Sequence, residues 1–356
     1  MNTKNSKKET IIITGVTGQM GSWLADYFLG KDFDVIGTVR RLSVPNHDNI
    51  EHINNRRFRL ELMDLGDSYS IDNLINLYKP DYFINCAANS FVADSWKSPA
   101  QYFDYNSLGV LRQLEAINRF SPKTKYLNFG SSEEFGDVQY SPQDEKHPLR
   151  ARSPYGASKI AARQIVKVYR ESYKLYAVQP WCFNYESERR GKQFITRKVA
   201  IAVANAYHSI KNNCSFRPVE VGNLEARRDW SYAVDFIDGI WKMLNQNPDN
   251  LKEYVFASGE NHTIREFIET AFAIVGIKGE WMGKTSQQQA FWHISGPKGA
   301  ASRDSILVQV NQKFYRQNEL EILLGDSSLA RKELGWAPTT SFHSLVQKMV
   351  EHEIKL

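Results

Sequence analysis

The first half of the chain alternates short apolar, β-branched runs with longer segments that have helical spacing. Residues 10–14 (TIIIT) form the first such run, a glycine-rich turn follows at once, and residues 22–29 have the pattern of a helix. Strands that alternate with helices form parallel sheets through right-handed crossovers. The sequence therefore predicts an α/β fold built on a Rossmann-like, doubly wound parallel sheet.

The same alternation continues to about residue 185. Further strands are expected at 33–39, 58–63, 81–88, 125–130 and 176–183, and further helices at 71–78, at 155–173 and in a long segment that ends near 120. Beyond residue 185 helical patterns predominate, at 196–208, 234–244, 263–275, 328–334 and 342–353, with a strand near 254–257 and a polar loop at 286–305.

This change of pattern predicts two domains. We expect a Rossmann domain at 1–185, joined by returning segments near 222–257. Residues 186–356 would mainly form a smaller C-terminal α/β domain that binds substrate. A length of 356 residues suits two domains of ordinary size.

Composition argues against several classes of protein. The formal net charge of +5 comes without a dense basic stripe, so we expect no nucleic-acid partner. No apolar stretch reaches membrane-spanning length, so we expect no membrane segment. Cys86, Cys182 and Cys214 are odd in number and far apart, which predicts neither disulfides nor a metal site. The polar N-terminus is not a signal peptide, and the cysteine usage suits a reducing compartment, so we expect a cytoplasmic protein.

The turn after the first strand predicts a dinucleotide site. Gly15, Gly18 and Gly21 lie between that strand and the following helix, where they allow the backbone to approach a pyrophosphate. The second strand ends at Arg40 rather than at the acidic residue that binds the ribose of NAD, and arginine suits a 2′-phosphate, so we expect NADP. The alternative is that Arg40 and its neighbour only cap the strand. Asp64-Leu65 ends the third strand and would flank the adenine.

Two further motifs indicate proton transfer. The segment SSEEFG at 131–136 contains Glu133, and SPYGASK at 153–159 contains Tyr155 and Lys159. A tyrosine and a lysine four residues apart lie on one helix face, and the ammonium favours the tyrosinate. The alternative is a solvated helix face, because this spacing also occurs by chance. We expect Glu134 to point to the opposite side and to take no part in the chemistry.

These motifs and others resemble the extended short-chain dehydrogenase/reductase family and, within it, the GDP-mannose 4,6-dehydratases. The resemblance covers about residues 11–350. Its most specific segments are TGVTGQMGSWLADYFL, VIGTVRR, IEHI, RSPYGASK, FNYESERRGKQFITRK, VGNLEARRDW, SGENHTIREF, FYRQNEL and LGWAP.

The resemblance implies a role for each matching residue. Tyr155 would be the base, Lys159 its electrostatic partner and a ligand of the nicotinamide ribose, Ser131 a hydrogen-bond partner of the sugar 4-hydroxyl, and Glu133 the acid/base. Cofactor positions would include Gly15, Gly18, Gln19, Arg40 and Asp64. Asn184, Lys198, Arg228 and Arg316 would hold the nucleotide diphosphate, and Glu319 would lie near the GDP end.

Several of the expected substrate-binding residues could instead have a purely structural role. An isolated arginine is more often a solvated surface charge, and Arg227 or Arg228 could instead form an ion pair with Asp229. Asn184 could be a simple turn residue at a strand end.

The resemblance also implies a reaction. In this family a sugar C4 hydroxyl gives its proton to the tyrosinate and its hydride to NADP⁺. A carboxylate then removes the C5 proton, the C6 hydroxyl leaves as water, and the hydride returns to C6. The implied function is that of a lyase (a hydro-lyase) in deoxysugar and polysaccharide biosynthesis. It would convert a GDP-sugar to the GDP-4-keto-6-deoxy sugar and work as a homodimer or homotetramer.

Two departures from the family pattern leave alternatives open. Ser131 stands where the dehydratases usually carry threonine, and serine there is common in related epimerases and reductases. An enzyme of C4 oxidation, epimerisation or reduction is therefore one alternative, and a noncatalytic NADP-binding regulator is another. Glu133 favours dehydration, because C4 chemistry alone needs no base at C5. Phe91 differs from the usual residue near the sugar and would alter the pocket, so the expected substrate is GDP-mannose or a GDP-manno-heptose.

Overall fold

The computed structural model describes residues 8–283, 289–293, 306–315 and 322–356. The chain divides into two compact units, each built from three segments. The first unit comprises Met1–Cys182, Ala233–Phe256 and Asp326–Ala337; the second comprises Phe183–Tyr232, Ala257–Gly325 and Pro338–Leu356. The chain thus returns to the first unit twice. The second return lies within the range 186–356 that the sequence analysis assigns mainly to the other domain.

The first unit is organised around a six-stranded parallel sheet. The strand order is β3-β2-β1-β4-β5-β6, and β1 pairs with β2 on one side and with β4 on the other. The strands are β1 (Thr10–Thr14), β2 (Asp34–Val39), β3 (Phe58–Leu62), β4 (Tyr82–Asn85), β5 (Lys125–Asn128) and β6 (Ala177–Val178). This order, reversed about β1, is that of a doubly wound Rossmann sheet, so the predicted fold class is confirmed.

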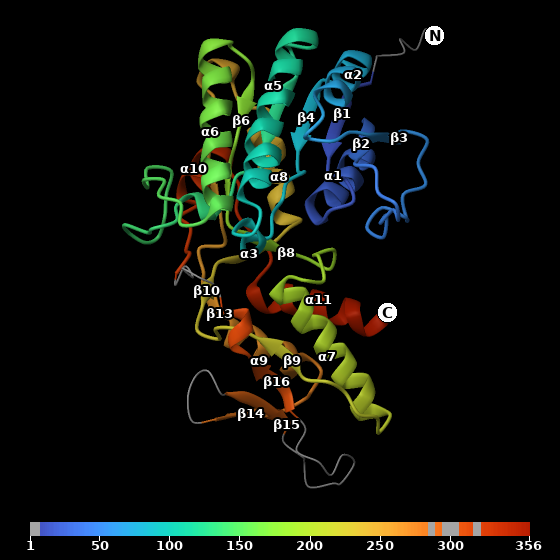
Figure 1. The fold of residues 1–356 in the computed structure, drawn as a ribbon, viewed down its shortest axis with the longest axis vertical. Coiled ribbons are helices and arrows are strands. Elements are labelled where there is room, and N and C mark those ends of the chain that lie inside the picture. The colour runs from blue at the N-terminus through green and yellow to red at the C-terminus, as the bar shows by residue number, and fades with distance from the viewer. Residues whose placement is uncertain (1–7, 284–288, 294–305, 316–321) are drawn as a thin grey trace. The chain divides into compact units, whose positions relative to one another are not determined.

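Helices cover this sheet and bury its apolar side chains. Three of them, α2 (Ser68–Tyr78), α5 (Gly109–Phe120) and α6 (Pro154–Ser172), lie side by side in Figure 1. Phe83 of β4 packs in the core beneath them with Leu114 and Val166. This layer brings α6, which carries Tyr155 and Lys159, against β6.

A second, aromatic core lies on the other side of β4, because successive side chains of a strand alternate between the two faces. Tyr82, next to Phe83, packs against Trp241 with ring centroids 5.3 Å apart, and Phe28 lies 5.5 Å from the same indole. These residues join α1 (Gln19–Gly30) to α8 (Asp235–Met243), the helix of the first returning segment. The return of the chain thus completes the core of the first unit.

Two expected elements are interrupted. The expected strand 176–183 is divided into β6 and β7 (Trp181–Cys182), because Pro180 between them has no N–H to donate to a ladder. The long helix expected to end near 120 contains a π-helical turn, η1 (Asp104–Leu108), between α4 (Pro99–Phe103) and α5. Such π turns often accompany functional sites.

The described part of the second unit combines helices with a sheet that the sequence analysis missed. Its helices α7 (Ile195–Lys211), α9 (Ile264–Ile274) and α11 (Phe342–Lys355) pack together, and its four-stranded sheet has the order β14-β15-β16-β9. The strands of this sheet are β9 (Val219–Val221), β14 (Gly279–Met282), β15 (Ala290–His293) and β16 (Ile306–Val310).

The polar loop expected at 286–305 is therefore wrong in part, because β15 lies within it. Its four residues AFWH are too few to raise the hydrophobicity of a polar stretch, and their pairing with β14 and β16 is what forms the strand. Residues 286–288 and 294–305 lie outside the described part of the chain.

Within the described ranges no helix has the length and apolar character needed to cross a bilayer. The same ranges contain no group of three or more His, Cys, Asp or Glu side chains arranged to hold a metal ion.

Candidate active site

Tyr155 and Lys159 lie one turn apart near the start of α6. Ser153 caps this helix by accepting the Gly156 N–H at 3.0 Å, and Pro154 occupies its first position. The Lys159 Nζ lies 5.9 Å from the centroid of the Tyr155 ring and donates to the Phe129 carbonyl at 2.8 Å. Both side chains are more than nine-tenths buried, so the pair does not form a solvated helix face.

The surroundings of Lys159 set its charge. Burial lowers the pKa of the Lys159 ammonium to about 8, while the carboxylate of Glu134 acts in the opposite direction. A lysine that is protonated at neutral pH and loses its proton just above it suits a group that stabilises a tyrosinate.

Ser131 and Glu133 follow β5 and pack against the beginning of α6. Ser131 caps a short 3₁₀ helix, η2 (Ser132–Glu134), and its Oγ accepts the Glu133 N–H at 3.2 Å. A Cβ added to Gly156 would lie 2.5 Å from the Glu133 carbonyl oxygen, so only glycine permits this approach next to Tyr155. The fold thus brings the two sequence motifs together in the first unit.

The glycine turn has the shape that a bound pyrophosphate requires. Gly15 has φ +62°, and the Gly18 N–H closes the turn onto the Gly15 carbonyl at 2.9 Å. A Cβ at Gly21 would lie 2.4 Å from that same oxygen. In the described part of the chain no side chain caps the N-terminus of α1 at Gly18, so its first N–H groups can receive an anion. Gln19 is buried at the start of this helix.

The other expected cofactor residues follow adjacent strands at the same edge. Arg40 comes directly after β2 and is exposed, and Asp64 follows β3 and is half-buried. The Asp64 Oδ1 accepts the Gly66 N–H at 2.8 Å. Leu65 differs, because its side chain is buried in the core with Val110 and Leu114. Only its backbone remains as a candidate for contact with an adenine.

The expected substrate residues belong to the second unit. Asn184 begins β8 (Asn184–Glu186), and its buried Oδ1 has no hydrogen-bond partner among the residues that the structure describes. The Lys198 Nζ donates to the Glu220 carbonyl at 2.6 Å and lies 4.0 Å from the Phe314 ring centroid. Burial lowers the pKa of Lys198, and Glu220 opposes this effect. Arg316 and Glu319 lie outside the described residues.

Arg228 lies in β10 (Arg227–Arg228) and is 7% exposed. Next to it, the carboxylate of Asp229 is held by backbone groups of the second unit. That carboxylate accepts three backbone N–H groups, those of Ser258 at 2.8 Å, Gly259 at 3.0 Å and Gly325 at 3.2 Å. Asp229 therefore anchors two loops of the second unit.

Asn106 is a site neighbour that the sequence analysis missed. It lies in the π turn η1, where its side chain accepts the Asn89 N–H at 2.9 Å and donates to the Asn89 carbonyl at 3.0 Å. It also donates to the Ser158 Oγ at 3.1 Å, directly before Lys159. An asparagine within an apolar helical pattern was the only available signal.

A surface cleft of about 440 Å³ in the first unit shares no residue with these sets. It is lined mainly by amide and charged side chains of 241–254 together with Glu333. Lys252 and Glu333 pair across it at 2.7 Å, so its charges satisfy each other. We assign it no ligand.

A doubly wound sheet, a glycine turn and a buried Tyr-x-x-x-Lys helix define a dinucleotide-binding α/β enzyme of the short-chain dehydrogenase/reductase class. Solved structures share this fold. UDP-glucose 4-epimerase from Thermotoga maritima has a TM-score of 0.78 at 20% identity, covering 97% of this chain and 99% of that one. The structure of dTDP-glucose 4,6-dehydratase from Bacillus anthracis has a TM-score of 0.76 at 18% identity, covering 98% of this chain and 97% of that one.

Sequence relatives identify the family within this class. The profile of the family described as GDP-mannose 4,6 dehydratase matches residues 12–349. GDP-mannose 4,6-dehydratase of Vibrio cholerae serotype O1 is 39% identical, covering 98% of this chain and 94% of the relative. The corresponding protein of Homo sapiens is 37% identical, with 98% and 92% covered. The chain belongs to the GDP-mannose 4,6-dehydratase family, and the predicted resemblance and assignment to the hydro-lyases are confirmed.

Proposed function

We propose that this protein dehydrates a GDP-sugar, GDP-mannose or a GDP-manno-heptose, to the GDP-4-keto-6-deoxy sugar. The observation that carries the proposal is the packing of the Glu133 backbone against the first turn of α6, beside Tyr155 and Lys159. A tyrosine and a lysine suffice for redox chemistry at C4. A carboxylate beside them adds the proton transfers at C5 and C6 that water loss requires.

The first unit would hold NADP. Gly15, Gly18, Gln19 and Gly21 would receive the pyrophosphate at the start of α1, and Asp64 with the Leu65 backbone would flank the adenine. The exposed Arg40 would bind the 2′-phosphate, since β2 ends without an acidic residue at this position. When bound, the nicotinamide supplies reversible hydride chemistry, accepting a hydride from C4 and returning it to C6.

Tyr155 and Lys159 would start the reaction. The Tyr155 phenolate takes the proton of the sugar 4-hydroxyl, and the Lys159 ammonium favours the phenolate and holds the nicotinamide ribose. Ser131 Oγ orients the same sugar hydroxyl by a hydrogen bond, a role that serine supports as well as threonine because the hydroxyl is retained.

Glu133 would carry out the step that distinguishes a dehydratase. The 4-ketone acidifies the C5 hydrogen, which the Glu133 carboxylate removes as a base. The resulting carboxylic acid then protonates the departing C6 hydroxyl, so one group serves both transfers. When the hydride returns to C6, C5 would take up a proton, which balances the proton that Tyr155 took from the 4-hydroxyl.

The second unit would bind the nucleotide. We propose that Asn184, Lys198, Arg228 and Arg316 hold the diphosphate and that Glu319 lies near the GDP end. The nearly complete burial of Arg228 and the orphaned Asn184 Oδ1 support a ligand in this unit, since buried polar groups without partners are costly.

We further propose that the protein acts in the cytoplasm as a homodimer or homotetramer, in deoxysugar and polysaccharide biosynthesis. The assembly and the pathway follow from the family. The compartment is supported by Cys86, Cys182 and Cys214, which are free thiols and suit a reducing environment.

The test is incubation of the protein with NADP⁺ and either GDP-mannose or a GDP-manno-heptose, followed by mass spectrometry and nicotinamide absorbance. We expect loss of one water from one of the sugars without net accumulation of NADPH. Stoichiometric NADPH, or a product of unchanged mass, would instead establish the C4 dehydrogenase or epimerase alternative. No change with any sugar nucleotide would favour a noncatalytic regulator.

A further inference from the structure

A chain of buried side-chain hydrogen bonds crosses the carboxyl ends of the strands of the first unit. Thr14, the last residue of β1, donates from Oγ1 to the Asn85 Oδ1 at 2.6 Å. Asn85, at the end of β4, donates to the Asn128 Oδ1 at 2.7 Å, and Asn128, at the end of β5, donates to the Gln179 Oε1 at 2.6 Å. All four side chains are at least 97% buried.

In this row of hydrogen bonds every side chain donates in the same direction, from Thr14 toward Gln179. The Thr14 Oγ1 accepts the Ala87 N–H at 3.0 Å, so its own proton goes to the Asn85 carbonyl and the Asn85 NH₂ group must face forward. The same orientation repeats at Asn128 and Gln179. Gln179 finally donates from Nε2 to the Glu134 Oε1 at 3.2 Å. A row of donors that all point one way is best ended by an ionised carboxylate, which only accepts.

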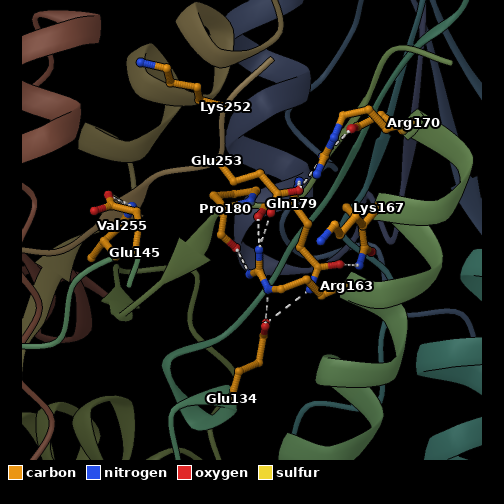
Figure 2. Close-up of polar contacts among 12 residues, drawn as sticks. Glu134, Glu145, Arg163, Lys167, Arg170, Gln179, Pro180, Lys252, Glu253 and Val255 are labelled. Atoms are coloured by element: carbon orange, nitrogen blue, oxygen red, sulfur yellow. Dashed lines mark hydrogen bonds and ion pairs between the residues drawn. The ribbon is translucent and has the colours of Figure 1, made fainter. Parts of the chain in front are cut away.

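The opposite charge that Glu134 needs comes from Arg163, one turn beyond Lys159 on α6. The Arg163 Nε donates to the Glu134 Oε2 at 2.5 Å, and the guanidinium also binds Glu253 at 2.7 Å and the Gln179 carbonyl at 2.6 Å (Figure 2). Burial raises the pKa of the Glu134 carboxyl, and Arg163 and Lys159 oppose this effect. Every contact of the two Glu134 oxygens is with a donor, which fits the ionised form.

Glu134 is bonded to Ser131 directly and to Lys159 through Gln179. Its Oε1 accepts the Ser131 N–H at 2.8 Å, and through Gln179, which also donates to the Lys159 carbonyl at 3.2 Å, it joins η2 to α6. The space is tight, because a Cβ at Gly130 would lie 2.7 Å from the Glu134 Oε1. The expectation that Glu134 points away from the chemistry assumed a strand, whereas the residue lies in a 3₁₀ helix and is fully buried.

The charges that face the Lys159 ammonium come from several elements. Glu134 of η2 raises its pKa, whereas burial and Arg163 lower it, and the Tyr155 ring lies one turn earlier on α6. Desolvation raises the pKa of the Cys86 and Cys182 thiols above the usual range, so both are neutral near neutral pH. Among these groups Glu134 is thus the carboxylate whose charge favours the Lys159 ammonium.

We propose that Glu134 is a positioning residue for the reaction, which pins the Ser131 segment and supplies the fixed negative charge that Lys159 requires. The inference rests on the proposed function, because it assigns Ser131 and Lys159 their roles. Glu134 itself contacts neither substrate nor cofactor in this scheme.

The first test is Glu134→Gln, which keeps the shape and removes the charge. One of its three donors then loses its acceptor, and Lys159 loses its proton at lower pH. We expect kcat to fall about 10- to 100-fold with a KM for the sugar nucleotide within about twofold. We also expect the alkaline limb of the kcat–pH profile to move to lower pH. A wild-type kcat and profile, with only a lower melting temperature, would overturn the proposal.

Two further variants separate positioning from folding. The double variant Glu134→Leu/Arg163→Met replaces the buried ion pair by apolar side chains. Proteins often tolerate such a replacement without loss of stability. We expect this variant to fold while kcat stays low and the alkaline limb stays shifted, and recovery of wild-type kcat would refute the role. Glu145→Gln is the matched control, because Glu145 also accepts a backbone N–H, from Val255 at 2.8 Å (Figure 2), but is not bonded to η2 or Lys159. Its kcat profile should be that of the wild type.

A measurement without substrate tests the role of Glu134 independently of the proposed dehydratase function. Hydrogen exchange of a peptide covering residues 129–136, followed by mass spectrometry, should be faster in the Glu134→Leu/Arg163→Met variant than in the wild type, because residue 134 then offers the Ser131 N–H no side-chain acceptor. If the wild-type protein turns over no GDP-sugar, the proposed function fails while faster exchange still supports the pinning of Ser131. Unchanged exchange refutes that pinning whatever the reaction is.

Discussion

Two adjacent glutamates of η2 have opposite surroundings. Glu133 is half-buried and its backbone lies against the first turn of α6, whereas Glu134 is fully buried and bonded to Ser131, Gln179 and Arg163. A carboxylate held by three donors is not free to exchange protons with a substrate, so Glu133 is the candidate acid/base.

We expect Glu133→Gln to slow water loss at least about 100-fold, the usual contribution of a positioned acid/base. Affinity for NADP⁺ should be unchanged, because the glycine turn is untouched. Product mass from GDP-sugar turnover measures the first effect and fluorescence titration the second. Glu51→Gln, an exposed glutamate, is the control and should behave as wild type. Wild-type turnover in Glu133→Gln would remove the basis of the dehydratase assignment.

Cofactor choice is a second question at the scale of single residues. Arg40→Ala should weaken NADP⁺ binding about tenfold or more and leave NAD⁺ binding nearly unchanged, since the lost contact is a charged one to the 2′-phosphate. Arg56→Ala removes another exposed arginine, and both affinities should then stay as in the wild type. Equal effects of Arg40→Ala on the two dinucleotides would mean that the arginine only caps β2.

At the scale of elements, the predicted helices and strands agree with the observed ones where residues close in the chain determine the element. The helix expected at 328–334 is observed with the same bounds, as α10 (Ser328–Leu334). Its end can be read from the sequence, because the glycine that follows it, Gly335, adopts the left-handed conformation that terminates a helix. The strand at 176–183 was too long, since Pro180 interrupts its ladder. The sheet containing β15 was missed, because its strands are short and β9 pairs with β16, a strand far from it in the chain.

The first strand–helix turn provides a prediction about an element. Gly21→Ala places a Cβ 2.4 Å from the Gly15 carbonyl oxygen, so α1 must shift away from the turn. We expect NADP⁺ affinity to fall at least about tenfold, with a loss of about 1–3 kcal/mol in the free energy of unfolding. Gly30→Ala, at the other end of α1 with open space around it, should be neutral or stabilising by up to about 1 kcal/mol. Isothermal titration and chemical unfolding measure both.

At the scale of the whole molecule, each unit is assembled from segments far apart in the chain. The first unit takes its last piece from Asp326–Ala337, where Trp336 packs on Phe236 and Phe256 with ring centroids 5.7 Å and 4.7 Å away. The Trp336 Nε1 also donates to the Asp235 carbonyl at 2.7 Å. A residue near the C-terminus thus completes the core of the unit that would bind NADP.

Trp336→Ala should therefore destabilise the first unit by about 3–5 kcal/mol, the usual cost of removing a buried aromatic side chain. We expect a lower melting temperature that added NADP⁺ partly restores, because ligand binding stabilises the native state. Tyr69→Ala, which removes a ring that is 75% exposed, should have little effect. If Trp336→Ala melted at the wild-type temperature, this segment would not belong to the core of the unit.

Much of this protein was determined by local sequence alone. The alternation of apolar runs and helical segments predicted the doubly wound sheet, and the spacing of Gly15, Tyr155 and Lys159 predicted the candidate site, because both depend on neighbours a few residues apart. Only the tertiary structure decided which elements return to the first unit and that Glu134 is buried against Arg163 and Gln179. Those contacts join residues 29 and 45 positions apart, and no periodicity in the chain records a partner at such a distance.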